Sequence, residues 1–184
     1  RGAIHVSDQG SIDNSLLPAT GENLKLVAGG NGASTSSCGV FEVASDGQID
    51  SQVGSAPNTT FSITFMKWDA GDNKLDTSLN SSGVFHATTW NSSMAQAWSS
   101  TSNDTICAFL IHGNAADWIK TGEGSYSSTL VTAITQLGGT VAVMDTSVLL
   151  GSYIVLGRKQ ASAHSDGTEF VSSLGENGGT ISLT

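Results

Sequence analysis

The sequence carries unusually little charge. Only seven of its 184 residues are Lys or Arg, and charged residues make up 12% of the chain, against about 25% in an average soluble domain. The net charge is −9, and the only adjacent cation pair is Arg158-Lys159. Nucleic-acid binders need clustered cations to displace phosphate counterions, and anionic membranes attract cationic segments. We therefore expect neither as a partner.

Long apolar segments are also missing. The longest run, Ser147 to Leu156, is interrupted by Gly151 and Ser152, and spanning a bilayer takes roughly 20 apolar residues. We therefore expect no membrane insertion. No signal peptide is recognisable and the chain starts at Arg1, so we expect a processed chain or a piece of a longer protein.

Cysteine and proline are scarce, with two residues of each. Cys38 and Cys107 allow one disulfide at most. Cys107 lies in the apolar run Ile106–Ile111, a setting typical of a small buried hydrophobic residue. The sequence leaves both alternatives open.

Hydroxyl side chains and glycine take the place of charge. Ser and Thr together account for 47 residues and Gly for 22, so neutral polar groups solvate the surface. Such a surface favours an extracellular protein or a virion component over a cytosolic enzyme. A hydrophobic content of 38% excludes disorder, and the length fits one domain, residues 1–184.

Short strand-like runs separated by turn residues dominate the pattern. Alternating or continuous apolar residues predict strands, and Asp46-Gly47 is a strong hairpin signal. The predicted strands are Leu24–Val27, Phe41–Val43, Phe61–Phe65, Val84–Ala87, Ile106–Ile111, Thr140–Met144 and Tyr153–Leu156.

Two segments are predicted to be helices. Met94–Trp98 is short and follows Ser92-Ser93, whose hydroxyls are suited to capping backbone N–H groups. Tyr126–Leu137 has apolar residues at helical spacing and is followed by Gly138-Gly139, a typical helix end. The predicted fold is α+β and mostly β, with packed antiparallel sheets, like a β-sandwich, flanked by two short helices.

The motifs of common catalytic and metal sites are missing. The sequence has no Gly-x-Ser-x-Gly element, and its four histidines show no metal-binding spacing. Asp69 to Asp76 is oxygen-rich but does not match a calcium loop, and Gly29 to Gly32 lacks the lysine of a phosphate loop. We expect a protein that is not an enzyme and that has no metal and no cofactor.

The four tryptophans offer the clearest hint of a binding surface, because all of them border polar sequence. An indole ring can stack on a sugar while polar neighbours bond the hydroxyls. The alternative for each ring is a place in the core. The stretch from His112 to Ser125 is the favoured site because it is polar and leads from a strand to a helix. The candidate ligand-binding residues are Trp118, Asp117, Asn114, Trp90 and Trp98.

Four short segments form a recognisable set: Leu26–Gly30, Gly83–His86 with the preceding turn Asp69–Lys74, Gln136–Gly139, and Gly151–Lys159. They resemble segments of the ILEI/PANDER-like domain, a family found in secreted cytokine-like proteins, a glycan-binding stem domain and phage tail fibres. Gly151–Lys159 looks like the family's closing aromatic-apolar-Gly-x-Lys strand. The resemblance is clearest over residues 24–159, with 160–184 left as C-terminal strands or a tail.

The resemblance implies a non-catalytic binding module, but the family's sugar contacts do not transfer. Where the sugar-binding relative has an arginine and an Arg-Asp pair, this sequence has Asn58 or Thr59 and Leu150-Gly151. The expected function is extracellular recognition of a glycan or cell-surface receptor, by a homotrimer or a part of a larger viral or phage fibre. A secreted signalling protein and a purely structural domain of a virion or filament are the alternatives.

Overall fold

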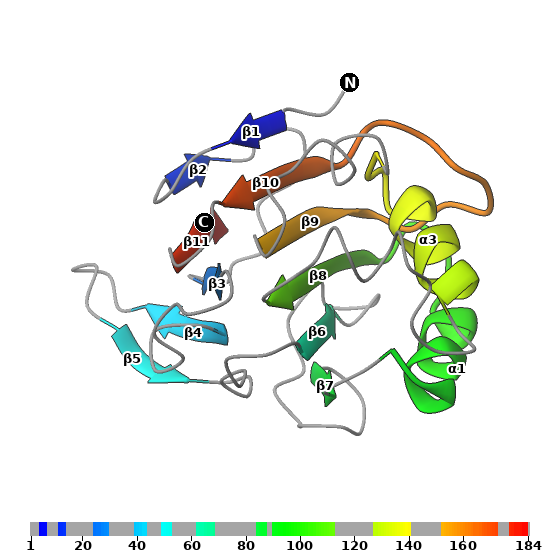
Figure 1. The fold of residues 1–184 in the computed structure, drawn as a ribbon, viewed down its shortest axis with the longest axis horizontal. Coiled ribbons are helices and arrows are strands. Elements are labelled where there is room, and N and C mark those ends of the chain that lie inside the picture. Colours follow the sequence, from blue (N-terminus) through cyan, green and yellow to red (C-terminus); the bar gives the residue numbers. More distant parts are fainter. Residues whose placement is uncertain are drawn as a thin grey trace.

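The structure is a computed structural model that describes residues 4–6, 11–13, 24–29, 39–43, 49–52, 62–68, 84–87, 90–112, 127–140, 152–172 and 177–183. Within these residues, strands form two sheets and two helices lie together on one side of the larger sheet (Figure 1). The described helices are too short to cross a bilayer.

The larger sheet has six strands in the order β1-β10-β9-β8-β6-β7. They span Ile4–Val6 (β1), Thr168–Ser172 (β10), Ser152–Arg158 (β9), Ile106–His112 (β8), Ser62–Lys67 (β6) and Val84–Ala87 (β7). All neighbouring strands are antiparallel except β1 and β10, which are parallel. The central strands β8 and β9 coincide with two of the predicted apolar strands, which confirms those predictions.

The smaller sheet has the order β2-β11-β3-β4-β5. Its strands span Ser11–Asp13 (β2), Asn177–Leu183 (β11), Leu24–Gly29 (β3), Gly39–Val43 (β4) and Ile49–Gln52 (β5). β4 and β5 pair antiparallel, as the Asp46-Gly47 turn signal predicts. Since β10 and β11 lie within residues 160–184, that segment forms C-terminal strands.

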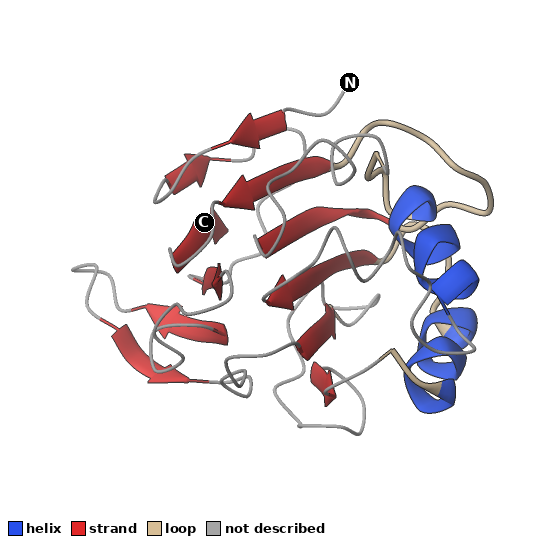
Figure 2. Cartoon of the chain, in the orientation of Figure 1, coloured by secondary structure: helices blue, strands red, loops and turns tan. Residues whose placement is uncertain are grey.

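Both predicted helices are present. They are α1 (Ser92–Ser100) and α3 (Ser127–Gln136), and they lie side by side along the larger sheet (Figure 2). The described part of the chain is therefore α+β, with antiparallel strands and two helices. The predicted strand Thr140–Met144 lies outside the described residues except for Thr140, which belongs to neither a helix nor a strand.

The helix ends follow local sequence chemistry, with one correction. The N-cap of α1 is Asn91, whose side-chain oxygen accepts from the Met94 N–H at 3.0 Å, so the prediction that Ser92-Ser93 provides the cap is wrong. An Asn oxygen one residue earlier reaches the N3 amide, and the two serines become the first, exposed helical residues. Gly138 ends α3 with φ +94°, the left-handed conformation expected of a glycine at that place.

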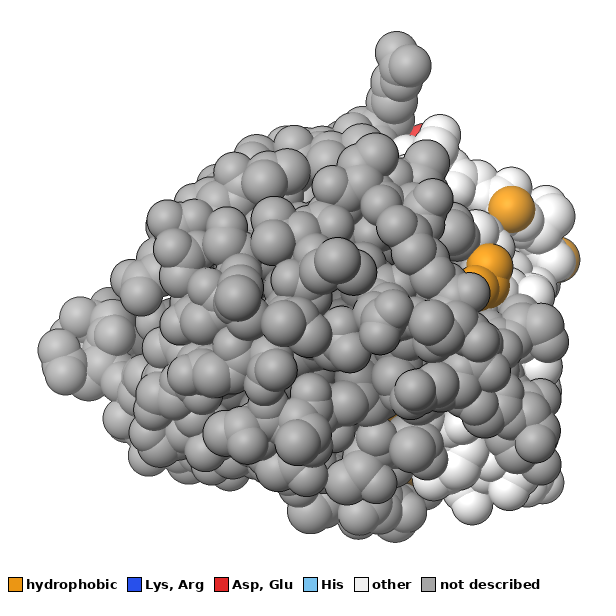
Figure 3. Space-filling view, viewed as in Figure 1, with side chains coloured by type: hydrophobic (Ala, Val, Ile, Leu, Met, Phe, Trp, Pro, Cys, Tyr) orange, Lys and Arg blue, Asp and Glu red, His pale blue; other side chains and the backbone are white. Residues whose placement is uncertain are grey.

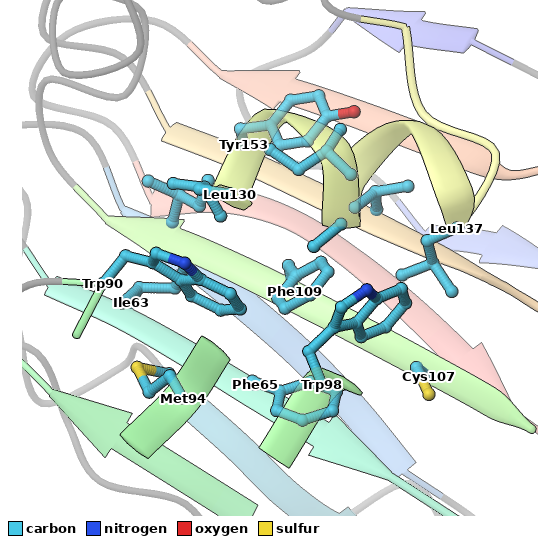
Figure 4. Close-up of a cluster of buried hydrophobic side chains, with 14 residues drawn as sticks. Ile63, Phe65, Trp90, Met94, Trp98, Cys107, Phe109, Leu130, Leu137 and Tyr153 are labelled. Carbon is cyan, nitrogen blue, oxygen red and sulfur yellow. The ribbon is translucent and has the colours of Figure 1, made fainter. Parts of the chain in front are cut away.

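The core forms where the helices meet the sheet (Figure 4). Alternate residues of β8, namely Cys107, Phe109 and Ile111, pack into a cluster with α1 and α3. The intervening Ile106, Ala108 and Leu110 are equally buried, and β3 lies against β8. Water is thus excluded from both faces of β8, in keeping with its continuous apolar sequence.

Cys107 is a free, buried cysteine. Its thiol donates to the Thr105 carbonyl oxygen at 3.6 Å, and burial raises its pKa well above the ordinary value. Cys38 lies outside the described residues. The sequence left open whether Cys107 forms a disulfide or is a small buried hydrophobic residue, and the structure shows the second.

Three glycines allow the end of α3 to sit directly on the sheet. A Cβ on Gly157 would lie 2.1 Å from the Leu137 carbonyl oxygen, and one on Gly138 would lie 2.3 Å from the Gly167 nitrogen. The Gly167 N–H donates to the Gly138 carbonyl oxygen at 3.2 Å. No side chain fits between these backbones, so the orientation of α3 relative to β9 depends on all three residues.

A buried carboxylate fixes the chain just after α3. Glu169 is 1% exposed and accepts hydrogen bonds from the Tyr153 hydroxyl and from both the N–H and the hydroxyl of Thr140. Burial and the neighbouring Glu169 carboxylate raise the pKa of Tyr153. The phenol therefore stays protonated and remains a donor, and the network ties the segment after α3 to β9 and β10.

Candidate binding groove between the helices

Three of the five candidate ligand-binding residues, Asn114, Asp117 and Trp118, lie outside the described residues. Their role as a recognition loop stays a prediction.

The other two candidates, Trp90 and Trp98, do not offer exposed rings. Their side chains are 2% and 5% exposed, and the two indoles lie on either side of Phe109 (Figure 4), with ring centroids 5.6 and 5.2 Å from it. Their neighbours in sequence are polar because these residues lie at the ends of an amphipathic helix. Polar context therefore reflects the exposed face of α1, and a ring face stacked on a sugar is ruled out for both indoles in this conformation.

Each of these indoles is tied to the second helix by its only donor. The Nε1–H of Trp90 donates to the Thr129 hydroxyl and that of Trp98 to the Gln136 side-chain oxygen, both at 2.8 Å. Thr129 and Gln136 lie seven residues apart, so they occupy the same face of α3. The two bonds fix the separation and the register of α1 and α3.

A groove of about 370 Å³ lies between the helices, directly over these bonds. Its volume falls in the range of about 300–1,000 Å³ that holds small ligands. The residues that line it are Trp90, Ala95, Trp98, Ser99, Asn103, Thr129, Thr132, Gln136, Lys159 and Ala161. The lining therefore has a floor of buried residues, Trp90, Trp98 and Lys159, and a rim of exposed hydroxyl and amide side chains, Ser99, Asn103 and Thr132.

The two helices that flank the groove carry no charge. Neither helix contains an acidic or basic residue, and none of the described lining residues is a carboxylate. On the side formed by the helices, the described surface in Figure 3 consists mainly of polar uncharged groups and backbone, with a few apolar patches. The described lining residues therefore offer hydrogen-bonding groups and no carboxylate that could bind a cation.

Lys159, the single cation among the described lining residues, is engaged by the protein. It is 7% exposed, and its Nζ donates to the carbonyl oxygens of Trp98 and Thr101 at 2.6 and 2.7 Å. It also lies 4.8 Å from the Trp98 ring centroid. Burial lowers its pKa from the ordinary value. The ammonium thus satisfies carbonyls at the C-terminus of α1, where a positive charge is stabilised by the helix dipole.

The turn that carries Asn103 is held firmly against the end of β9. Asp104 adopts φ 67°, and its N–H donates to the Lys159 carbonyl oxygen at 2.8 Å. Its own carbonyl accepts from Arg158 at 2.8 Å, and its carboxylate accepts from Gln160 at 3.0 Å. Asn103 is exposed and therefore presents its amide from a fixed position at the mouth of the groove.

The segment after β9 closes the groove at the end of α3. The Gln136 side-chain amide donates to the Ala161 carbonyl oxygen at 3.2 Å. His164 places Nε2 at 2.9 and 3.1 Å from the carbonyl oxygens of Gln136 and Arg158, and its Nδ1 accepts from the Asp166 N–H at 3.2 Å. This arrangement assigns the proton to Nε2 and uses His164 as a cap for α3 rather than as a ligand-binding group.

In the part of the chain that the structure describes, no three His, Cys, Asp or Glu side chains lie together in a way that fits a metal ion. His86 pairs with Thr64 on one side of β6, and His112 pairs with Ser62 on the other. The two histidines are thus on strands separated by β6.

No protein-family model matches the chain, and neither curated proteins nor solved structures give a significant match.

Sequence reasoning missed the groove-forming residues Gln136, Thr129 and Lys159. The signal for α3 was present, because Thr129, Thr132 and Gln136 repeat polar residues at helical spacing on one face. Their pairing with Trp90 and Trp98 depends on how the helices cross the sheet, which local sequence does not encode.

Proposed function

We propose that this chain is a non-enzymatic recognition domain that is displayed outside the cell and binds a glycan or a cell-surface receptor, as part of a viral or phage tail fibre or a similar appendage. The observation that carries the proposal is the groove between α1 and α3, which is uncharged along its helices and has a hydroxyl and amide rim. Such a rim suits a neutral polar ligand.

The composition supports display in an extracellular setting. A chain with 47 Ser and Thr residues, 12% charge and only seven cations is solvated by neutral groups. A fibre domain of this kind gains binding strength from several linked copies, so modest affinity in one groove is sufficient for attachment.

The proposal extends to the architecture. We infer a mostly β fold in which the two sheets pack face to face as a sandwich and the helices cover the outer face of the larger sheet. Support comes from Ile106, Ala108 and Leu110, which are buried on the face of β8 opposite the helices, and from the position of β3 against β8 and β9.

The ILEI/PANDER-like assignment is part of the same proposal. Two segments that carry the resemblance, Gln136–Gly139 and Gly151–Lys159, meet in space. The Leu137 carbonyl lies against Gly157, and the Gln136 carbonyl accepts from Gln160 just after the second segment. Close packing against the end of α3 thus explains the glycine of the Gly-x-Lys element, Gly157. Capping of the C-terminus of α1 explains its lysine, Lys159.

Cell binding by a trimerised form tests this function. The chain is fused to a trimeric coiled coil, labelled, and applied to a panel of bacterial and animal cells, with the coiled coil alone as control. We expect saturable binding that falls after periodate oxidation of surface glycans or after protease treatment. Failure to bind any cell above the control contradicts the proposal, as does receptor signalling by the monomer at the potency of the trimer, which identifies a signalling protein.

A further inference from the structure

From the groove's geometry we infer that it is the binding site for a neutral pyranose unit of a glycan, and that Ser99, Asn103 and Thr132 are its contact residues. The inference rests on the proposed recognition function and gives it a site and a ligand class. It places the site on the helical side of the sheet, whereas the sequence favoured the stretch from His112 to Ser125.

The indole and ammonium donors of the floor bond within the protein, and the inference assigns ligand contact to the exposed side chains of the rim. The indole N–H groups of Trp90 and Trp98 bond to α3, and Lys159 bonds to two carbonyl oxygens. Ser99, Asn103 and Thr132 are exposed and line the groove. A hydroxyl or a primary amide both donates and accepts hydrogen bonds, which is the capacity needed to bond the hydroxyls of a sugar.

The charges of the groove select a neutral ligand. Among the described lining residues, a cationic ligand finds no carboxylate. An anionic ligand finds Lys159 as the single described cation, and this residue is 7% exposed and committed to the C-terminus of α1. Drawing Lys159 toward an anion would leave two buried carbonyl oxygens without their donor, which is unfavourable.

The floor matches the carbon face of the sugar ring. Trp90, Trp98, Ala95 and Ala161 supply the apolar part of the lining, and pyranose rings present C–H groups between their hydroxyls. Because the two indoles are locked by hydrogen bonds and by contacts with Phe109, the site is formed before the ligand arrives. Such pre-formation lowers the entropic cost of binding.

Two pairs of substitutions on the purified full chain test the site. Ser99→Trp fills the groove from an exposed position on α1, and Ser93→Trp places the same side chain at an exposed position of α1 that does not line the groove. Asn103→Ala removes one amide from the rim, with Ser102→Ala as its exposed neighbour outside the lining. Circular dichroism and melting curves verify that each variant folds.

The probes are immobilised oligosaccharides of glucose, galactose, mannose and N-acetylglucosamine, together with their sialylated and sulfated forms. We expect the wild type to bind neutral members. Ser99→Trp should weaken binding at least tenfold, because it blocks the groove, and Asn103→Ala about three- to tenfold, the effect of one hydrogen bond. Ser93→Trp and Ser102→Ala should bind like the wild type.

The outcomes separate this inference from the proposed function. Equal binding by Ser99→Trp and Ser93→Trp, or a preference for the sialylated or sulfated probes, overturns the assignment of the groove to a neutral sugar. Binding to cells without binding to any oligosaccharide overturns it as well but leaves recognition intact. If the chain binds neither cells nor oligosaccharides, the proposed recognition function itself is wrong.

Discussion

The groove has two regions that differ in how their polar groups are used. In the floor, Trp90 and Trp98 are buried and both indole donors are bonded to α3, and Lys159 is bonded to the end of α1. In the rim, Ser99, Asn103 and Thr132 are exposed and uncharged. Although the floor and the rim line one cavity, the floor is buried and bonded within the protein, whereas the described rim side chains are exposed.

In the proposed site, Trp90 and Trp98 would contribute by holding the helices apart and would not offer a ring face to the ligand. The floor's hydrogen bonds set the spacing of α1 and α3, and that spacing creates the groove. The account predicts that floor substitutions reduce stability and rim substitutions reduce binding alone.

The largest expected effect is at Trp98. Trp98→Ala removes a 5%-exposed ring that contacts Phe65 and Phe109, and it should lower the free energy of unfolding by about 3–5 kcal/mol. Urea denaturation measures this change. Trp98→Phe keeps much of the volume and loses the bond to Gln136, so it should cost less. A Trp98→Ala variant as stable as the wild type would show that the floor is not part of the core.

Lys159 comes next. Lys159→Met keeps the packing of the stem but removes the donor for the carbonyl oxygens of Trp98 and Thr101. We expect a loss of about 1.5–3 kcal/mol in urea denaturation, the range for hydrogen bonds that involve a charged group. Arg158→Met, which loses one bond to the Asp104 carbonyl from a more exposed site, is the matched control and should cost less. A smaller effect at Lys159 than at Arg158 contradicts the capping role.

The pH dependence of stability tests whether water is excluded from the thiol of Cys107 in the core. Burial raises its pKa, so above about pH 9 the unfolded chain releases the thiol proton while the folded chain keeps it. The unfolded state then binds fewer protons, and stability falls as pH rises. Relative to Cys107→Ala, the wild type should lose about 1 kcal/mol between pH 9 and pH 10. Parallel pH profiles for the two proteins would mean that the thiol ionises as readily in the folded state.

The smallest effect on stability is expected at the rim. Thr132→Ala and Asn103→Ala change exposed side chains, and each should alter the free energy of unfolding by no more than about 0.5 kcal/mol. Thermal and urea denaturation measure it. A loss as large as that of Lys159→Met at either position would remove the distinction between floor and rim.

Elements of the fold were predictable from the sequence where local chemistry determines the secondary structure. The apolar runs of β8 and β9, the period-two pattern of β6 and the Gly138-Gly139 stop of α3 each encode one element, and the structure confirms all four. The N-cap of α1 was assigned to Ser92-Ser93 instead of Asn91 because Asn and Ser are both good capping residues, and only backbone geometry selects between them.

The candidate site was less predictable, because it depends on contacts between residues about 40 positions apart. Trp90 and Trp98 were selected for their polar neighbours, yet those neighbours occupy the exposed face of a helix whose other face is core. The pairing of each ring with α3 arises from the packing of both helices on the sheet. Lys159 is likewise far in sequence from the C-terminus of α1, and only the folded structure brings the two together.

The most direct test of the groove is its response to ligand in solution. In ¹H–¹⁵N spectra of the labelled chain, titrated with the oligosaccharide that binds most tightly in the array, each indole N–H and each amide reports separately. The account predicts the largest shifts at the amides of Ser99, Asn103 and Thr132, with smaller shifts at the indole N–H groups of Trp90 and Trp98. Saturating shifts confined to residues 112–125, with the groove signals unchanged, would contradict it.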